Sequence, residues 1–79
     1  LNANAVVDYE ASLGDYVYLG SGAVVSPNAV VEDEVFIGAS ATIAGPVKIG
    51  KGARIGAGSV VIEDVEAGAT VFGNPAKPL

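Results

Sequence analysis

Aliphatic residues recur at every sixth position along almost the whole chain. Counting from Leu1, eleven of the twelve residues at this first place of the repeat are Leu, Ile or Val, and the exception is Ala67. The fifth place holds only small or β-branched residues, and Gly occupies the second place six times. The phase holds through residue 72. An α-helix repeats its apolar positions about every 3.6 residues, so this pattern is not helical.

A period of six fits short β-strands joined by tight turns. The fifth place and the next first place lie two residues apart, so both side chains point to the same side of a strand. The third and fourth places carry turn residues such as Asn28, Gly52 and Gly58. Three strands and three corners close a coil of about 18 residues, so we predict an all-β parallel β-helix of about four coils over residues 1–72, followed by a tail at 73–79. An antiparallel β-sandwich is the alternative, but it does not explain a strict period of six.

Composition excludes several classes of function. The chain has no Cys, so disulfides and thiolate metal sites are excluded. It has no His, the commonest general base and zinc ligand, and we expect no metal. Nine acidic and four basic residues give a net charge of −5, which argues against nucleic acid and anionic membranes as partners. We find neither a membrane span nor a signal peptide, and we expect a cytoplasmic protein.

Three repeats and the tail carry a resemblance to a known family. The repeats at 19–24, 49–54 and 55–60 resemble the hexapeptide repeat of left-handed parallel β-helix acyltransferases, and residues 73–77 resemble the tail that closes that helix. The resemblance covers all 79 residues and implies left-handed coils, a homotrimer and acetyl-coenzyme A as cofactor. Residues 6–18 look closest to the C-terminal domain of the sugar acetyltransferases of sialic acid and bacterial aminosugar synthesis, which implies an aminosugar acceptor. Some members of the fold are not transferases, so a trimeric scaffold without cofactor or catalysis is the alternative.

The outward residues of the predicted coils sort into three faces. One face reads as solvated and carries Ser12, Val30, Lys48 and Glu66. Another carries Tyr18, Phe36, Arg54 and Phe72, and the third is rich in Val. Two largely apolar faces on so small a chain predict association between copies, unless the β-branched residues reflect strand propensity alone.

One predicted corner carries only small residues through all the coils. It includes Ala39 and Ser40 in one coil and Ala57 and Gly58 in the next, so a ligand can lie against the backbone and use its N–H and C=O groups. The resemblance places coenzyme A along such a corner between subunits, and the matching residues are Ala39, Ala57, Gly58 and Ser59. We expect Lys77 to meet the nucleotide phosphates as a point charge. The alternative is that small corners only permit tight turns or close subunit packing.

The next corner holds the strongest departure from the family. There the resemblance places a histidine general base at Tyr9, an acid that orients it at Glu10, and a second histidine at Tyr18. Histidine is largely neutral at pH 7, whereas tyrosine keeps its proton, and the acidic Asp8 and Glu10 disfavour a tyrosinate at Tyr9. We therefore expect the ordinary histidine mechanism to be lost and acetyl transfer to be absent or much weakened. The alternatives are tyrosines that pack at a subunit contact, or a working enzyme that uses Glu10 or Tyr9 as its base.

The family branch also has an N-terminal nucleotide-binding-like domain that has no counterpart in residues 1–79. The chain starts at Leu1 without a Met, and we expect a piece excised or engineered from a larger enzyme, with a natural short chain as the alternative. Whether the chain is an enzyme is left open by the sequence, and so is the acceptor.

Overall fold

The chain folds into three stacks of very short parallel strands. A computed structural model describes residues 6–7 and 11–78, and among them it contains strands and turns but no helix. Sheet A consists of β1 (Val6–Val7), β4 (Val24–Val25), β7 (Thr42–Ile43) and β10 (Val60–Val61). Sheet B consists of β2 (Ser12–Leu13), β5 (Val30–Val31) and β8 (Lys48–Ile49). Sheet C consists of β3 (Tyr18–Leu19), β6 (Phe36–Ile37), β9 (Arg54–Ile55), β11 (Thr70–Gly73) and β12 (Ala76–Pro78).

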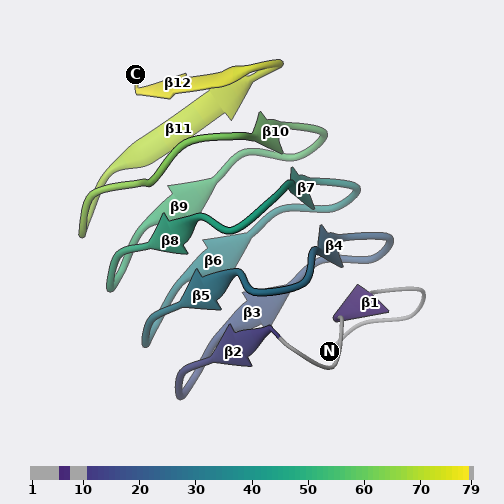
Figure 1. The fold of residues 1–79 in the computed structure, drawn as a ribbon. Coiled ribbons are helices and arrows are strands. Elements are labelled where there is room, and N and C mark those ends of the chain that lie inside the picture. The colour runs from purple at the N-terminus through teal and green to yellow at the C-terminus, as the bar shows by residue number, and fades with distance from the viewer. Residues whose placement is uncertain (1–5, 8–10, 79) are drawn as a thin grey trace.

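Successive coils stack in a constant register (Figure 1). Val24 of sheet A pairs with Thr42, and Phe36 of sheet C pairs with Arg54, each 18 residues further along the chain. Nearly every strand pair is parallel, because each strand meets the equivalent strand of the next coil. The all-β class and the parallel, coiled architecture predicted from the period of six are therefore confirmed.

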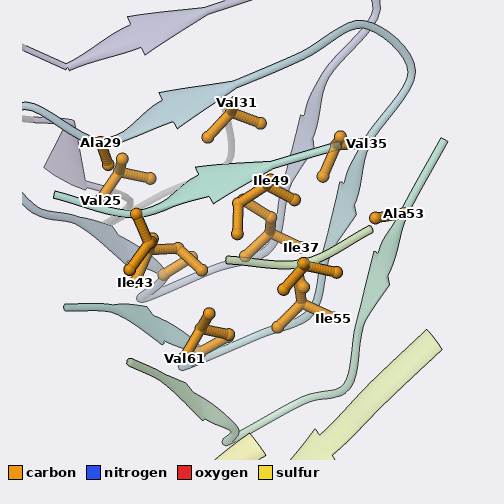
Figure 2. Close-up of a cluster of buried hydrophobic side chains, with 14 of the residues drawn as sticks. Val25, Ala29, Val31, Val35, Ile37, Ile43, Ile49, Ala53, Ile55 and Val61 are labelled. Carbon is orange, nitrogen blue, oxygen red and sulfur yellow. The ribbon is translucent and has the colours of Figure 1, made fainter. Parts of the chain in front are cut away.

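The aliphatic positions of the repeat form one continuous core along the axis of the solenoid (Figure 2). Leu19, Ile37 and Ile55 stack above one another in sheet C, and each is no more than 1% exposed. Fifth-place residues such as Ala23 and Ala41 are completely buried beside them. The small fifth place and the branched first place alternate, so the narrow interior fills without aromatic side chains.

The last coil is two residues shorter than the others, which corrects the constant phase expected through residue 72. Val65 pairs with Ile49 and Val71 pairs with Ile55, so both partners are 16 residues apart. Val65 and Val71 therefore take the first place, and Ala67, which the pattern placed inside, lies on the surface. The shortening falls in the corner that follows β10.

The shift also changes two of the expected faces. Arg54 pairs with Thr70, and Phe72 covers the backbone of Gly56 in place of lying beside Arg54. On sheet B, the Lys48 amide donates to the Asp64 carboxylate, in the position expected for Glu66.

A short antiparallel hairpin ends the described chain. β12 pairs with β11 so that Phe72 faces Lys77 and Gly73 faces Ala76. This hairpin covers the last strand edge of sheet C (Figure 1). The described residues include no helix with the length and hydropathy needed to cross a bilayer.

Glycine at the second place lets neighbouring coils approach closely. A Cβ on Gly20 would lie 2.5 Å from the backbone N of Ala39, and a Cβ on Gly38 would lie 2.6 Å from the backbone N of Ala57. Both contacts are with backbone atoms of the next coil, which cannot rotate away. The close stacking of coils therefore requires glycine at these two positions.

We predict that Gly38→Ala lowers the free energy of unfolding by about 3 kcal/mol or more, because the methyl group forces two backbones apart. Gly52→Ala is the matched control, since its Cβ would meet open space and only the φ of 73° opposes it, at about 1–2 kcal/mol. Chemical denaturation measures both values. Equal losses in the two variants would contradict the close-approach explanation.

Candidate functional site

The corner between sheets C and A, which we call the small corner, presents bare backbone to solvent. It comprises residues 21–22, 39–40 and 57–58, and no side chain in it is larger than serine. The backbone of its fourth-place residues lies in the left-handed region, with φ of 75° at Gly22, 60° at Ser40 and 71° at Gly58. Ala39, Ser40, Ala57 and Gly58 are all exposed. The sequence prediction that this corner lacks bulk is confirmed in the described coils.

Part of the backbone at the small corner is already paired between coils. The Gly58 N–H donates to the Ala39 carbonyl at 2.8 Å, and the Ser40 N–H donates to the Ser21 carbonyl at 2.9 Å. The third-place N–H groups differ. Within the part of the chain that the structure describes, the N–H groups of Ala39 and Ala57 have no acceptor. Because successive coils are about 4.8 Å apart, these amides form a short row of open donors along the axis.

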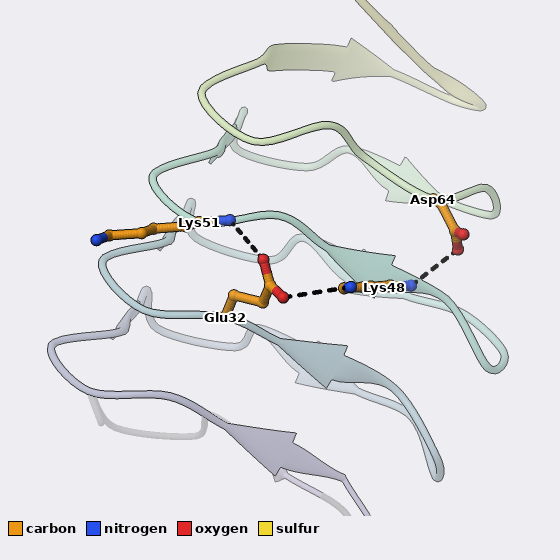
Figure 3. Close-up of polar contacts among 4 residues, drawn as sticks. All are labelled: Glu32, Lys48, Lys51 and Asp64. Atoms are coloured by element: carbon orange, nitrogen blue, oxygen red, sulfur yellow. Dashed lines mark hydrogen bonds and ion pairs between the residues drawn. The ribbon is translucent and has the colours of Figure 1, made fainter.

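The corner between sheets B and C, which we call the polar corner, has a similar backbone but carries acidic side chains. It comprises residues 15–16, 33–34, 51–52 and 67–68. Two of its third-place amides are capped by carboxylates, since Asp15 donates to Asp33 Oδ1 at 2.8 Å and Lys51 donates to Glu32 Oε1 at 3.0 Å. The N–H groups of Asp33 and Ala67 have no acceptor among the described residues. Figure 3 shows Glu32 between the Lys51 amide and the Lys48 ammonium, whose Nζ lies 3.4 Å from its other oxygen. Carboxylates therefore cap part of the polar corner, whereas no side chain caps the amides of Ala39 and Ala57 in the small corner.

The five residues expected to hold a cofactor are only partly brought together. Ala39, Ala57 and Gly58 lie on the small corner as expected. Ser59 is 1% exposed, and its Oγ accepts a hydrogen bond from the Gly73 N–H at 3.1 Å. Lys77 lies on β12 with its Nζ 3.8 Å from Glu63 Oε1, and both side chains are largely exposed. The structure thus turns the Ser59 hydroxyl toward the C-terminal hairpin and pairs Lys77 with an acid.

The expected catalytic positions fall at the edge of what the structure describes. Tyr9 and Glu10 lie outside the described residues. Tyr18 lies on β3, 47% exposed, and its ring stacks on Phe36 with centroids 4.7 Å apart and planes 3° from parallel. Phe36 was not predicted as a site residue. Its position 18 residues after Tyr18, one coil further along the chain, is the sequence feature that places the two rings side by side.

Ser59 is the one buried polar side chain of the described core, and its bond to Gly73 predicts a measurable role in stability. Ser59→Ala should lower the free energy of unfolding by about 1–3 kcal/mol, because it leaves a partly buried N–H without an acceptor. Amide exchange at Gly73 should rise in the same variant. Ser26→Ala, a half-buried serine on another coil, should change the stability by less than about 0.5 kcal/mol. If Ser59→Ala is as stable as the parent, the hairpin is held by its strand pairing alone.

Comparison with known proteins supplies a family. The model of the bacterial transferase hexapeptide (six repeats) matches residues 28–63. No curated protein is a significant match to the chain. Among solved structures, a mutant of perosamine N-acetyltransferase from Caulobacter crescentus in complex with CoA and GDP-perosamine is 33% identical, with a TM-score of 0.96 over 99% of this chain.

Two serine acetyltransferases are also similar. The enzyme from Neisseria gonorrhoeae in complex with serine is 36% identical, with a TM-score of 0.83 over 95% of the chain. The enzyme from Brucella abortus in complex with coenzyme A is 32% identical, with a TM-score of 0.71 over 92% of the chain. The chain covers only 37% of the perosamine and gonococcal proteins and 40% of the Brucella protein. By its repeat, its solenoid and these likenesses, the chain belongs to the hexapeptide-repeat acyltransferase family.

Proposed function

We propose that the chain is the β-helical domain of a cytoplasmic sugar acetyltransferase that binds acetyl-coenzyme A and has lost its histidine base. In this proposal residues 1–72 form about four left-handed coils, and residues 73–79 form the closing tail. The observation that carries the proposal is the row of open N–H groups at Ala39 and Ala57, on a corner that carries no side chain large enough to cover it. The similar perosamine and Brucella enzymes, each solved with coenzyme A, support the choice of ligand.

The pantetheine arm of coenzyme A fits the chemistry of this corner. The arm is extended and carries two amides, whose carbonyl oxygens are acceptors for N–H groups placed one coil apart. Ala39, Ala57 and Gly58 would lie beneath the arm, and the buried Ser59 would contribute through its backbone. Lys77 would reach the nucleotide phosphates only after releasing Glu63, an exchange that costs little because exposed ion pairs contribute about 0–1 kcal/mol.

Association of three copies would complete this groove. Sheets C and A flank the small corner, and they expose Tyr18, Phe36 and Phe72 on one side and Ile62 on the other, each between 43% and 56%. Apolar surface of this kind marks an interface, and closed threefold symmetry satisfies every copy equally. We therefore propose a homotrimer whose subunit boundaries run along the small corners.

Acetyl transfer needs a base as well as a groove. The amine or hydroxyl of the acceptor attacks the thioester carbonyl, the carbon–sulfur bond breaks, and a base must take the proton that the acceptor releases. We propose that Tyr9 fills the place of that base and keeps its own proton at neutral pH, with Glu10 next in the sequence and Tyr18 on β3 in the place of the second histidine. Acetyl transfer by this chain then rests on proximity alone. The acceptor we propose is an aminosugar.

Two contacts favour a second candidate function, a trimeric scaffold without a cofactor. The Ser59 hydroxyl and the Lys77 ammonium, both expected in the groove, are engaged by Gly73 and Glu63. In a scaffold the small corner would serve only to pack subunits. Binding of the cofactor separates the two candidates.

The groove predicts that calorimetric titration with acetyl-coenzyme A gives about one site per chain, on a sample whose trimeric mass is verified by sedimentation. Ala57→Leu should weaken binding by about tenfold or more, because the larger side chain covers the open donors. Ala67→Leu adds the same bulk to an exposed alanine on the polar corner and should bind like the parent. An intact trimer that does not bind the cofactor would support the scaffold.

The lost base predicts a gain of function. Tyr9→His should raise acetyl transfer to an aminosugar by about 10²–10⁴, the usual contribution of a positioned general base. Tyr16→His places the same ring on the exposed polar corner and should have no effect. No gain in Tyr9→His with cofactor binding intact would contradict the proposal. Measurable activity in the parent that Glu10→Gln abolishes would assign the role of base to Glu10.

A further inference from the structure

Sheet A ends in an open strand edge at its C-terminal end. In the coils below, the Val24 N–H donates to the Ala41 carbonyl and the Ala44 N–H donates to the Val61 carbonyl, both at 2.9 Å. The equivalent N–H groups in the last coil belong to Val60 and Ile62. Among the described residues neither has an acceptor, because β10 is the last strand of sheet A. In sheet C the last parallel strand, β11, is covered at this end by β12 (Figure 1).

A hollow of mixed lining lies beside this edge. Its volume is about 320 Å³, enough for an aliphatic side chain, and it is lined by five aliphatic and three acidic residues. Ile62, the residue that follows β10, is 53% exposed. The residues that line the hollow are Val61, Glu63, Asp64, Val65, Glu66, Ala69, Val71 and Ala76.

The charges around the hollow select its occupant. Glu63, Asp64 and Glu66 follow β10 directly, and only Glu63 has a cationic partner among the described residues, the exposed Lys77 at 3.8 Å. Asp64 accepts from the Lys48 amide, so its negative charge is not neutralised. A second copy of a chain with a net charge of −5 is repelled from such an end, whereas a basic segment is attracted. The same carboxylates therefore protect the open edge from stacking on other copies.

We propose that this edge is a docking site for an extended, basic segment of a partner protein, independent of the cofactor groove. The segment adds to sheet A as a further parallel strand, and its carbonyl oxygens accept the N–H groups of Val60 and Ile62. Alternate side chains of a strand point to one side, so an aliphatic residue enters the hollow. Lysine or arginine residues that follow the strand then lie over Glu63, Asp64 and Glu66.

The test uses a synthetic peptide, acetyl-Thr-Val-Thr-Val-Lys-Lys-amide, titrated into the ¹⁵N-labelled protein. We expect the amide signals of Val60 and Ile62 to shift, and those of the Ala39 and Ala57 amides to stay in place. The matched peptide that ends in Glu-Glu should bind at least about tenfold more weakly. Equal binding of the two peptides, shifts elsewhere on the solenoid, or no binding of the basic peptide would each overturn the proposal.

Two variants separate the charge from the strand edge. Glu66→Lys should lower the affinity for the basic peptide by about tenfold at low salt. Glu34→Lys, the same change on the polar corner, should leave that affinity within about twofold of the parent's. Ile62→Pro removes one open donor without breaking a hydrogen bond of the chain, and binding should be lost while the remaining amide spectrum is retained. Full affinity in both Glu66→Lys and Ile62→Pro would overturn the proposal, as would end-to-end assembly of the parent in sedimentation.

Discussion

The stacking of one backbone on the next is the constraint on which the whole molecule depends. Each coil donates N–H groups to the carbonyls of its successor, as Gly20 donates to Ile37 and Gly38 donates to Ile55. At Gly20 and Gly38 this approach depends on the missing Cβ, because the backbone of the next coil passes where a Cβ would lie. Once that spacing is set, equivalent aliphatic side chains must stack, and a core of Leu, Ile, Val and Ala closes without aromatic residues.

The same constraint explains why the corners are the places where function can differ. The small and polar corners repeat nearly the same backbone from coil to coil, so each repeats its donors at the spacing of the coils. At the polar corner, Asp33 caps the Asp15 amide of the preceding coil and Glu32 caps the Lys51 amide of the following coil, whereas the alanines of the small corner leave their amides open. An extended ligand that carries amides therefore meets carboxylates along the polar corner and uncovered N–H donors at Ala39 and Ala57. In the function proposed above, the identity of two or three side chains, rather than a change of fold, separates the binding groove from a structural edge.

The period of six was enough to predict the class, the parallel stacking and the buried positions, because a repeat has few ways to close. It was not enough to find the shortened last coil. Val65 and Val71 suit both the fifth place and the first, so the phase seemed unbroken, and Ala67 was the only residue that broke the aliphatic series. The surroundings of the site residues were harder to predict. The Ser59 hydroxyl is buried and binds the Gly73 N–H, although its small-residue position suited an open corner equally well. Lys77 pairs with Glu63, an acid that only folding brings close to it. Tyr9 and Glu10 stay predictions from the resemblance to the family.

The open amides of the small corner are the proposed ligand contacts, and amide exchange with and without acetyl-coenzyme A measures their protection residue by residue. In the free protein the amides of Ala39 and Ala57 should exchange rapidly, and those of Gly38 and Gly58, which are bonded between coils, should be protected. Added acetyl-coenzyme A should slow exchange at Ala39 and Ala57 and leave the capped amides of Asp15 and Lys51 unchanged. Protection that appears elsewhere on the solenoid, or an unchanged Ala39 and Ala57 with the cofactor bound, would contradict the claim that the small corner holds the ligand.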